Sequence, residues 1–212
     1  MSISEKTLKS EYSSKLYFFI AFNFLIAWSV IIFGKIEFNN ITVFLKEAVS
    51  QESLIGIFLP ITTIVINGLL SSNIKAKLVF WKIKNPLPGS IAFSKLSHSD
   101  ARISIKSLES RNGVLPTDPQ EQNRLWYNIY KKHDNKPIIH EVHRNFLFTR
   151  DMSSIAFLFA VLWLFAMPFL HIEILAKSLL WLVYVLEYFL TMIAARNYGH
   201  RFVCNVLAEE SV

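Results

Sequence analysis

A single carboxylate, Glu187, stands in the middle of an apolar run, WLVYVLEYFLT, at residues 181–191. A charged side chain at the centre of a bilayer costs roughly 2.5 to 3.5 kcal/mol on insertion scales, so it should face a bundle interior, a partner side chain or water. On a helix, Tyr184, Glu187 and Thr191 share one stripe because they follow steps of three and four. Two states are therefore open to Glu187: a protonated, hydrogen-bonded carboxyl or an ionised group in an aqueous path.

Partners for Glu187 lie on other apolar segments. The protonated form could bond Asn67, Asn23 or Thr63, whereas a salt bridge within the chain would need a long side chain reaching in from a helix end, because no lysine or arginine lies deep in these segments. In a symmetric oligomer the ionised form makes a ring of carboxylates, which favours cations. We favour the ring. The predicted pore-lining residues are Glu187, Thr191, Tyr184, Asn67 and Thr63.

Basic residues form the second group of residues that could bind a ligand. Of the 22 lysine and arginine residues, 14 lie between Lys75 and Arg150. Such a surplus suits anionic lipid, a nucleotide or nucleic acid held by its phosphates and stacked on an aromatic ring, or an acidic protein partner. The predicted ligand-binding residues are Lys82, Lys84, Arg124, Trp126, Lys131, Lys132 and Arg144.

Signs of an enzyme are few. His140 and His143 lie one helical turn apart beside Glu141, with His133 upstream, but a metal or acid–base site needs further ligands that the sequence does not supply. The sequence has no Gly-rich phosphate loop, no paired cysteines and no nucleophile elbow. We therefore predict no catalytic residues, no metal and no cofactor, and expect the histidines to meet lipid head groups or a neighbouring subunit.

The elements that must position these residues are four apolar blocks of roughly 20 residues, near the length that crosses about 30 Å of hydrocarbon. We predict an all-α membrane protein with four transmembrane helices and a helical cytoplasmic insert between the second and third. The first block follows lysines but no cleavage pattern, so it should be a retained span. The blocks are Leu16 to Phe33, Leu54 to Leu70, Ile155 to Leu170 and Ile172 to Ala195.

The segments around these blocks divide the chain into three regions. Residues 1–71 should hold the N-terminal tail, the first two transmembrane helices and an outer amphipathic segment. Residues 72–151 should form the basic cytoplasmic helical region. Residues 152–212 should hold the last two transmembrane helices and a cytoplasmic tail. The excess of basic residues in the insert and at the termini places all three inside the cell. We therefore expect a multi-pass membrane protein, and the resemblance described below implies the inner membrane of a bacterium.

Helix signals divide the cytoplasmic region. The turn Asn85-Pro-Leu-Pro-Gly89 should end the extension of the second helix. Ser99-Asp100 could cap a helix that ends near Gly113, Thr117 and Gln120 could form a capping box for the next, and Pro137 should open the helix that runs into the third block.

Paired spans on both sides of a basic insert, Leu16 to Leu70 and Ile155 to Ala195 around Lys75 to Arg150, resemble the small membrane subunits of bacterial anti-phage defence systems. The resemblance is architectural, covers most of the chain and includes no diagnostic motif. Two kinds are similar: the Hailong-type membrane effector, an oligomeric channel controlled by a nucleic-acid ligand, and the Kiwa-type membrane subunit, which assembles with a DNA-binding partner.

Two functions follow as expectations. The first is a homo-oligomeric, cation-permeable channel, a tetramer by our prediction, that acts as a membrane effector in anti-phage defence and whose insert binds a nucleotide or single-stranded nucleic acid. Four short spans cannot easily enclose a pore alone, so the channel requires oligomerisation. The second is a membrane anchor or sensor that recruits a soluble partner protein.

Overall fold

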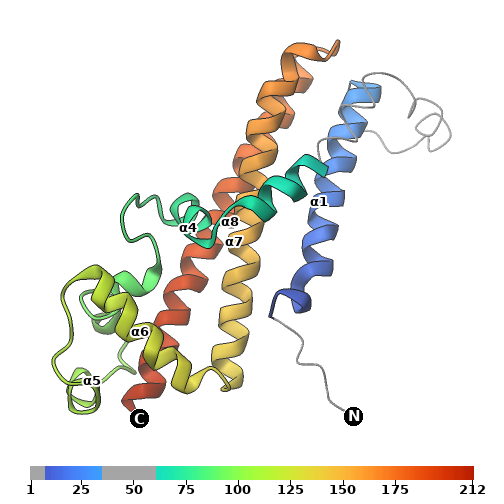
Figure 1. Ribbon diagram of the computed structural model, residues 1–212. Helices are drawn as coiled ribbons and strands as arrows, with labels where there is room; N and C mark the ends of the chain where they lie inside the picture. The colour runs from blue at the N-terminus through green and yellow to red at the C-terminus, as the bar shows by residue number, and fades with distance from the viewer. Residues whose placement is uncertain (1–7, 35–60) are drawn as a thin grey trace, which may run out of the picture. The chain divides into compact units, whose positions relative to one another are not determined.

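A computed structural model describes residues 8–34 and 61–212, and within these ranges every regular element is a helix (Figure 1). Three described helices are long and apolar enough to cross a membrane: Ser10–Phe33, Pro137–Phe169 and Ile174–Ser211. The all-helical prediction is confirmed for these ranges. The three helices contain the predicted first block, the third block up to Phe169 and the fourth block from Ile174 onward. Of the second block, residues 61–69 are helical. Residues 54–60, the predicted outer amphipathic segment and the first seven residues lie outside the described ranges.

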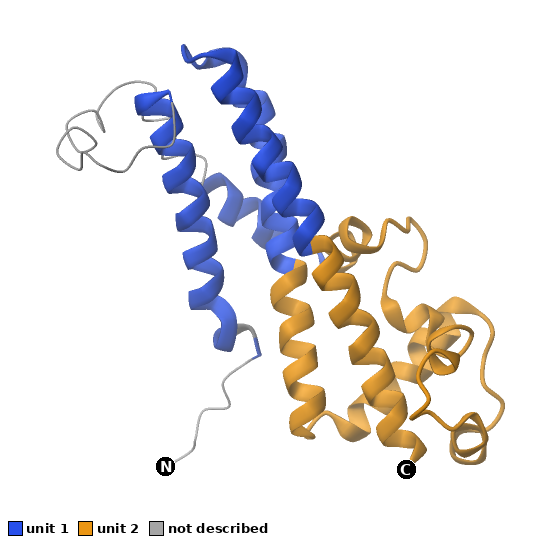
Figure 2. Ribbon diagram, turned by 180° about the vertical axis from the view of Figure 1, so that it is seen from behind, with its two compact units in different colours: residues 1–71, 151–191 blue, residues 72–150, 192–212 orange. Residues whose placement is uncertain are grey.

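The described residues divide into two compact units (Figure 2). Unit 1 takes its described residues from 8–34, 61–71 and 151–191, and includes α1 (Leu8–Phe33) and η3 (Met167–Phe169). Unit 2 comprises Ser72–Arg150 and Met192–Val212. Two long helices supply both units: α7 (Pro137–Ala166) and α8 (Ile174–Ser211).

Unit 2 is built on short elements and the end of α8. They are α4 (Ser72–Phe80), η1 (Pro88–Ile91), η2 (Leu96–His98), α5 (Ile105–Asn112) and α6 (Pro119–His133). Its core buries Phe202, Val206 and Leu207 of α8 together with Trp126 and Ile129 of α6. Residues 192–212, which we predicted to belong to a region with the last two transmembrane helices and a cytoplasmic tail, pack into the unit that holds the basic segment, because their apolar face is covered there.

Local signals explain several helix ends in unit 2. Pro137 opens α7 and Gly113 ends α5 with a φ of 77°, as predicted. Two caps differ. Asp118, not Thr117, caps α6 by accepting from the amides of Gln120 and Glu121. The residue that caps α5 is Ser104.

Asp100, which we predicted to cap a helix, pairs with Arg102 instead. Its carboxylate forms an ion pair with Arg102 at 2.7 Å, and hydrogen bonding to that guanidinium lowers the pKa of Asp100. The carboxylate is therefore held by the turn at 100–102 and not by a helix N-terminus.

Only part of α7 and α8 can lie in hydrocarbon. At 1.5 Å per residue, the 30 residues of α7 reach about 45 Å, well beyond a hydrocarbon core of about 30 Å. Charged residues occupy α7 up to Asp151; in α8, Lys177 and Glu187 are the charged residues before Arg196. The segments that can cross are therefore 152–169 and 174–195, and both contribute to unit 1.

Candidate functional site

Asn23, Tyr184 and Glu187 form a polar cluster inside unit 1, which we call the Glu187 cluster. Tyr184 is fully buried, and its hydroxyl donates to the backbone carbonyl of Asn23 at 3.1 Å. The Asn23 amide donates to the carbonyl of Phe19 at 3.1 Å and also lies within hydrogen-bonding reach of the Glu187 carboxyl. Of the three partners that the sequence left open for Glu187, the structure therefore places Asn23 beside it.

Two acceptor atoms in this cluster remain unfilled. Glu187 Oε2 and Asn23 Oδ1 are buried and have no hydrogen-bond partner among the described residues. A buried acceptor without a donor costs about 1 to 3 kcal/mol of folding free energy. The cluster therefore favours binding of a group that can interact with these oxygens. A proton on Glu187, a water molecule or a cation would each do so. The cluster can therefore hold a proton or a small cation within an apolar segment.

The other predicted pore-lining residues are Thr191, Asn67 and Thr63. Thr191 donates to the backbone carbonyl of Glu187 at 2.7 Å, so its hydroxyl is bonded within α8. Asn67 lines a cavity of about 360 Å³ with Ser13 and Ile20 of α1, and Glu187 does not line this cavity. Thr63 is fully buried, and its hydroxyl has no partner among the described residues. Of the five predicted residues, the Glu187 cluster therefore contains Tyr184 and Glu187, and Thr191 bonds the backbone of Glu187.

An aromatic cluster of Trp126, Tyr130, His143 and Phe202 lies at the centre of unit 2. Trp126 stacks on Tyr130 with ring centroids 6.0 Å apart and meets Phe202 edge-on at 5.1 Å. The imidazole of His143 stacks on Phe202 at 4.4 Å, and its Nδ1 lies 3.1 Å from the Tyr130 hydroxyl. Because burial removes water from these groups, the pKa of Tyr130 is raised and that of His143 is lowered to about 4.

This cluster borders a cavity of about 270 Å³, which we call the aromatic cavity. Arg150 supplies a cationic group to its lining, and Asn123 supplies an amide. Asn123 Oδ1 and Trp126 Nε1 are buried without a hydrogen-bond partner in the described part of the chain. The cavity therefore offers ring faces and a cation, a combination that suits a planar heterocycle joined to an anionic group.

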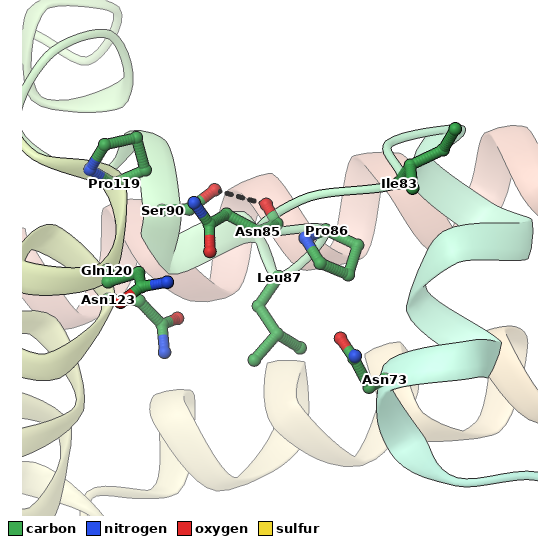
Figure 3. Close-up of a pocket in the computed structure, with 9 residues that line it drawn as sticks. All are labelled: Asn73, Ile83, Asn85, Pro86, Leu87, Ser90, Pro119, Gln120 and Asn123. Atoms are coloured by element: carbon green, nitrogen blue, oxygen red, sulfur yellow. Dashed lines mark hydrogen bonds between the residues drawn. The ribbon is translucent and has the colours of Figure 1, made fainter.

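A second cavity, of about 220 Å³, lies between the turn after α4 and the start of α6 (Figure 3). Ser90 donates to the backbone carbonyl of Asn85 at 2.9 Å on its wall. Asn123 and Leu87 line both this cavity and the aromatic cavity. At Gly89 an added Cβ would lie 2.5 Å from Asn123 Oδ1 and 2.7 Å from the Trp126 ring. A side chain here would fill the space that lets the turn lie against α6.

The predicted ligand-binding residues have different surroundings. Trp126 borders the aromatic cavity and is 6% exposed. Lys131 lies over the rings of Tyr127 and Tyr130 at 5.7 and 5.4 Å, and pairs with Asp134 at 3.5 Å. Arg124, Lys82 and Lys84 are exposed, and Arg144 is half-buried.

Lys132, predicted to bind a ligand, forms an ion pair with the buried carboxylate of Glu210. Glu210, near the end of α8, accepts from Lys132 at 2.9 Å, from His133 at 2.6 Å and from the amide of Asn112 at 3.1 Å. Burial would raise the pKa of Glu210, but these hydrogen bonds outweigh it and hold the pKa below its usual value. The neighbouring pair of Lys136 and Glu209 adds a second ion pair. This network ties α5, α6 and α8 together.

Sequence reasoning missed several of the residues that matter most. Gln122 is almost fully buried, and its side-chain oxygen accepts from the amides of Phe93 and Ser94 at 3.1 Å while its nitrogen donates to Thr117. Asn123 and Arg150 were also not selected. Their only sequence signal is a polar residue on the inner face of an amphipathic helix, which is weak.

The histidines of the HEVHR stretch form no metal centre. His143 stacks in the aromatic cluster, and within residues 8–34 and 61–212 no group of three or more His, Cys, Asp and Glu side chains could hold a metal ion. No protein family, curated protein or solved structure matches the chain.

Proposed function

We propose that the chain is a subunit of a homo-oligomeric, cation-permeable membrane channel. Its four spans are α1, the segment that contains helical residues 61–69, and the apolar parts of α7 and α8, with both termini in the cytoplasm of a bacterial cell. The observation that carries the proposal is the Glu187 cluster, where two buried acceptor oxygens lack a donor among the described residues. A carboxylate retained in an apolar span despite its cost is typical of ion pathways and proton relays.

Oligomerisation is a necessary part of this proposal. Large apolar side chains of α8 remain exposed in the single chain, among them Leu182, Leu186 and Leu190. Lipid or a neighbouring copy would cover them, and a tetramer would bring four Glu187 carboxylates around one axis. The subunit number is measured by native mass spectrometry of the full chain in nanodiscs.

The aromatic cavity supports ligand control. Ring faces and the guanidinium of Arg150 suit a nucleotide or a base of a single-stranded nucleic acid. The placement in anti-phage defence is supported only by the architectural resemblance to small membrane effectors.

Planar-bilayer recording of the full chain tests the channel. We expect cation current, and Glu187→Gln should lower the cation-to-anion permeability ratio because it removes one charge per subunit. Glu141→Gln, which removes an exposed carboxylate of unit 2, is the matched control and should leave the ratio unchanged. Unchanged selectivity in Glu187→Gln removes this residue from the pathway. Absence of any current, with a soluble protein co-purifying in stoichiometric amount, supports the anchor or sensor function instead.

A further inference from the structure

The loop of residues 81–84, which we call the WKIK loop, exposes apolar and basic side chains together. Trp81 and Ile83 are 58% and 84% exposed, and Lys82 and Lys84 are also exposed. Neither lysine forms an ion pair with any carboxylate that the structure describes. Isolated apolar side chains are common on protein surfaces. In the WKIK loop, however, exposed Trp and Ile side chains alternate with two lysines, so the surface is both apolar and basic.

Both ends of the WKIK loop are fixed by unusual backbone. Trp81 has a φ of 53° and donates its amide to the carbonyl of Lys77 at 2.9 Å, which ends α4. Asn85 has a φ of 49°, and its carbonyl accepts from Ser90. The left-handed region is tolerated by Asn but is unfavourable for a bulky side chain such as Trp. The contacts around Trp81 and Asn85 therefore hold the two ends of the loop in this conformation.

Arg196 holds the base of the WKIK loop. Its guanidinium lies over the Trp81 ring, 5.0 Å from the centroid, and its Nε donates to the backbone carbonyl of Val79. Arg196 is the first charged residue after the apolar part of α8, 174–195. Where α8 crosses a membrane, such an arginine lies at the level of the lipid head groups. Trp81, in contact with it, must then lie at nearly the same depth.

Several positively charged groups lie near the WKIK loop. Burial lowers the pKa of His200, and the positive charges of Lys95, Lys82 and Arg196 lower it further, so these cations lie close to one imidazole. Anionic head groups on the cytoplasmic leaflet are the complementary surface, and each nearby lysine or arginine contributes to that attraction.

We propose that the WKIK loop is an interfacial anchor, with Trp81 and Ile83 inserted at the head-group boundary and Lys82 and Lys84 in contact with anionic lipid. Trp is enriched at this depth because its ring is amphipathic, and lysines can reach outward to phosphates while their stems stay in apolar surroundings. This assigns Lys82 and Lys84 to lipid and not to the soluble ligand. The inference rests on α8 crossing a membrane, as in the proposed function, and does not require channel activity.

Collision accessibility of nitroxide labels in the reconstituted full chain tests the anchor. In a Cys204→Ala background, labels are attached at Ile83→Cys, at Val114→Cys and at Leu186→Cys, whose native side chains are 84%, 94% and 53% exposed. Oxygen and a water-soluble nickel chelate are the colliders, and bilayers of phosphatidylcholine are compared with bilayers that also contain phosphatidylglycerol. We expect the label at 83 to fall between the aqueous value at 114 and the hydrocarbon value at 186, and to lie deeper in the anionic bilayer.

Charge reversal identifies the lipid contact. Lys82→Glu with Lys84→Glu should shift the label at 83 towards the value at 114, whereas Lys106→Glu with Arg111→Glu, the same charge change on exposed residues of α5, should not. A label at 83 as water-accessible as that at 114, with 186 in hydrocarbon, overturns the anchor alone. An aqueous value at 186 as well overturns membrane crossing by α8 and with it the proposed function. Equal depth in neutral and anionic bilayers overturns the head-group contact.

Discussion

His143 of α7 lies face to face with Phe202 of α8, with ring centroids 4.4 Å apart and an angle of 5° between the planes. The Tyr130 hydroxyl, 3.1 Å from His143 Nδ1, joins α6 to the same pair. Burial, and then the charge of Arg150, lowers the pKa of His143 to about 4, so the imidazole is neutral at pH 7. A neutral histidine thus links three helices of unit 2.

This histidine should make stability depend on pH. The unfolded chain protonates His143 below about pH 6.5, whereas the folded chain resists protonation down to about pH 4. Stability from this group is therefore complete above pH 6.5 and is lost as pH falls towards 4, by about 2 kcal/mol at pH 5. Thermal unfolding in detergent at pH 7.5 and pH 5 measures the loss. His143→Phe should reduce the difference between the two pH values, and the exposed control His98→Gln should preserve it.

Gly89→Ala should destabilise unit 2. The new methyl group would lie 2.5 Å from Asn123 Oδ1 and 2.7 Å from the Trp126 ring, so the turn must move away from α6. Overpacking of this kind costs about 1 to 3 kcal/mol. The matched control is Gly68→Ala, at a helical position where nothing lies within 4 Å of the added atom. Chemical denaturation measures both, and equal stability of the two variants would contradict the packing.

Glu210→Gln should weaken the attachment of the end of α8. The change leaves Lys132 and His133 without the buried carboxylate that both now contact. We expect a loss of about 1 to 2 kcal/mol, less than for a fully buried pair because Lys132 is 53% exposed. Glu209→Gln breaks the more exposed pair with Lys136 and should cost less than about 1 kcal/mol. Hydrogen exchange of residues 202–211 reports the difference, and a larger effect in Glu209→Gln would contradict it.

Asn23→Leu should alter ion permeation in the same direction as Glu187→Gln. Asn23 is the polar neighbour of Glu187 and supplies the second unfilled acceptor, so its loss removes half of the oxygen pair. We expect lower cation selectivity in bilayer recordings. Asn67→Leu, in a cavity that Glu187 does not line, is the control. If only Asn67→Leu changes selectivity, the pathway follows that cavity instead.

Asn123→Leu should lower the affinity of the aromatic cavity for nucleotides. Asn123 supplies an amide to the cavity lining, so an apolar residue removes a polar group from the cavity wall. We expect at least a tenfold rise in the Kd of a fluorescent mononucleotide, corresponding to about 1.4 kcal/mol. Asn128→Leu replaces an exposed asparagine of the same helix and serves as the control. Equal affinities in the two variants would place the ligand elsewhere.

Local signals predicted much of the secondary structure. Apolar runs indicated the long helices, Pro137 the start of α7 and Gly113 the end of α5, because these depend on residues close in the chain. The caps at Asp118 and Ser104 were missed by one and by several residues, since neighbouring polar side chains compete for the same amides.

The sequence alone determined that the chain is helical, rich in apolar runs and basic between Lys75 and Arg150, and that Glu187 needs a polar neighbour. Only the tertiary structure decided that this neighbour is Asn23, that Lys132 bonds Glu210, and that Trp126 borders a cavity with Asn123. The physical reason is that periodicity fixes which residues share a helix face, but the rotation of each helix about its axis is set by packing against other helices. A rotation of one residue position, 100°, exchanges a buried partner for an exposed one.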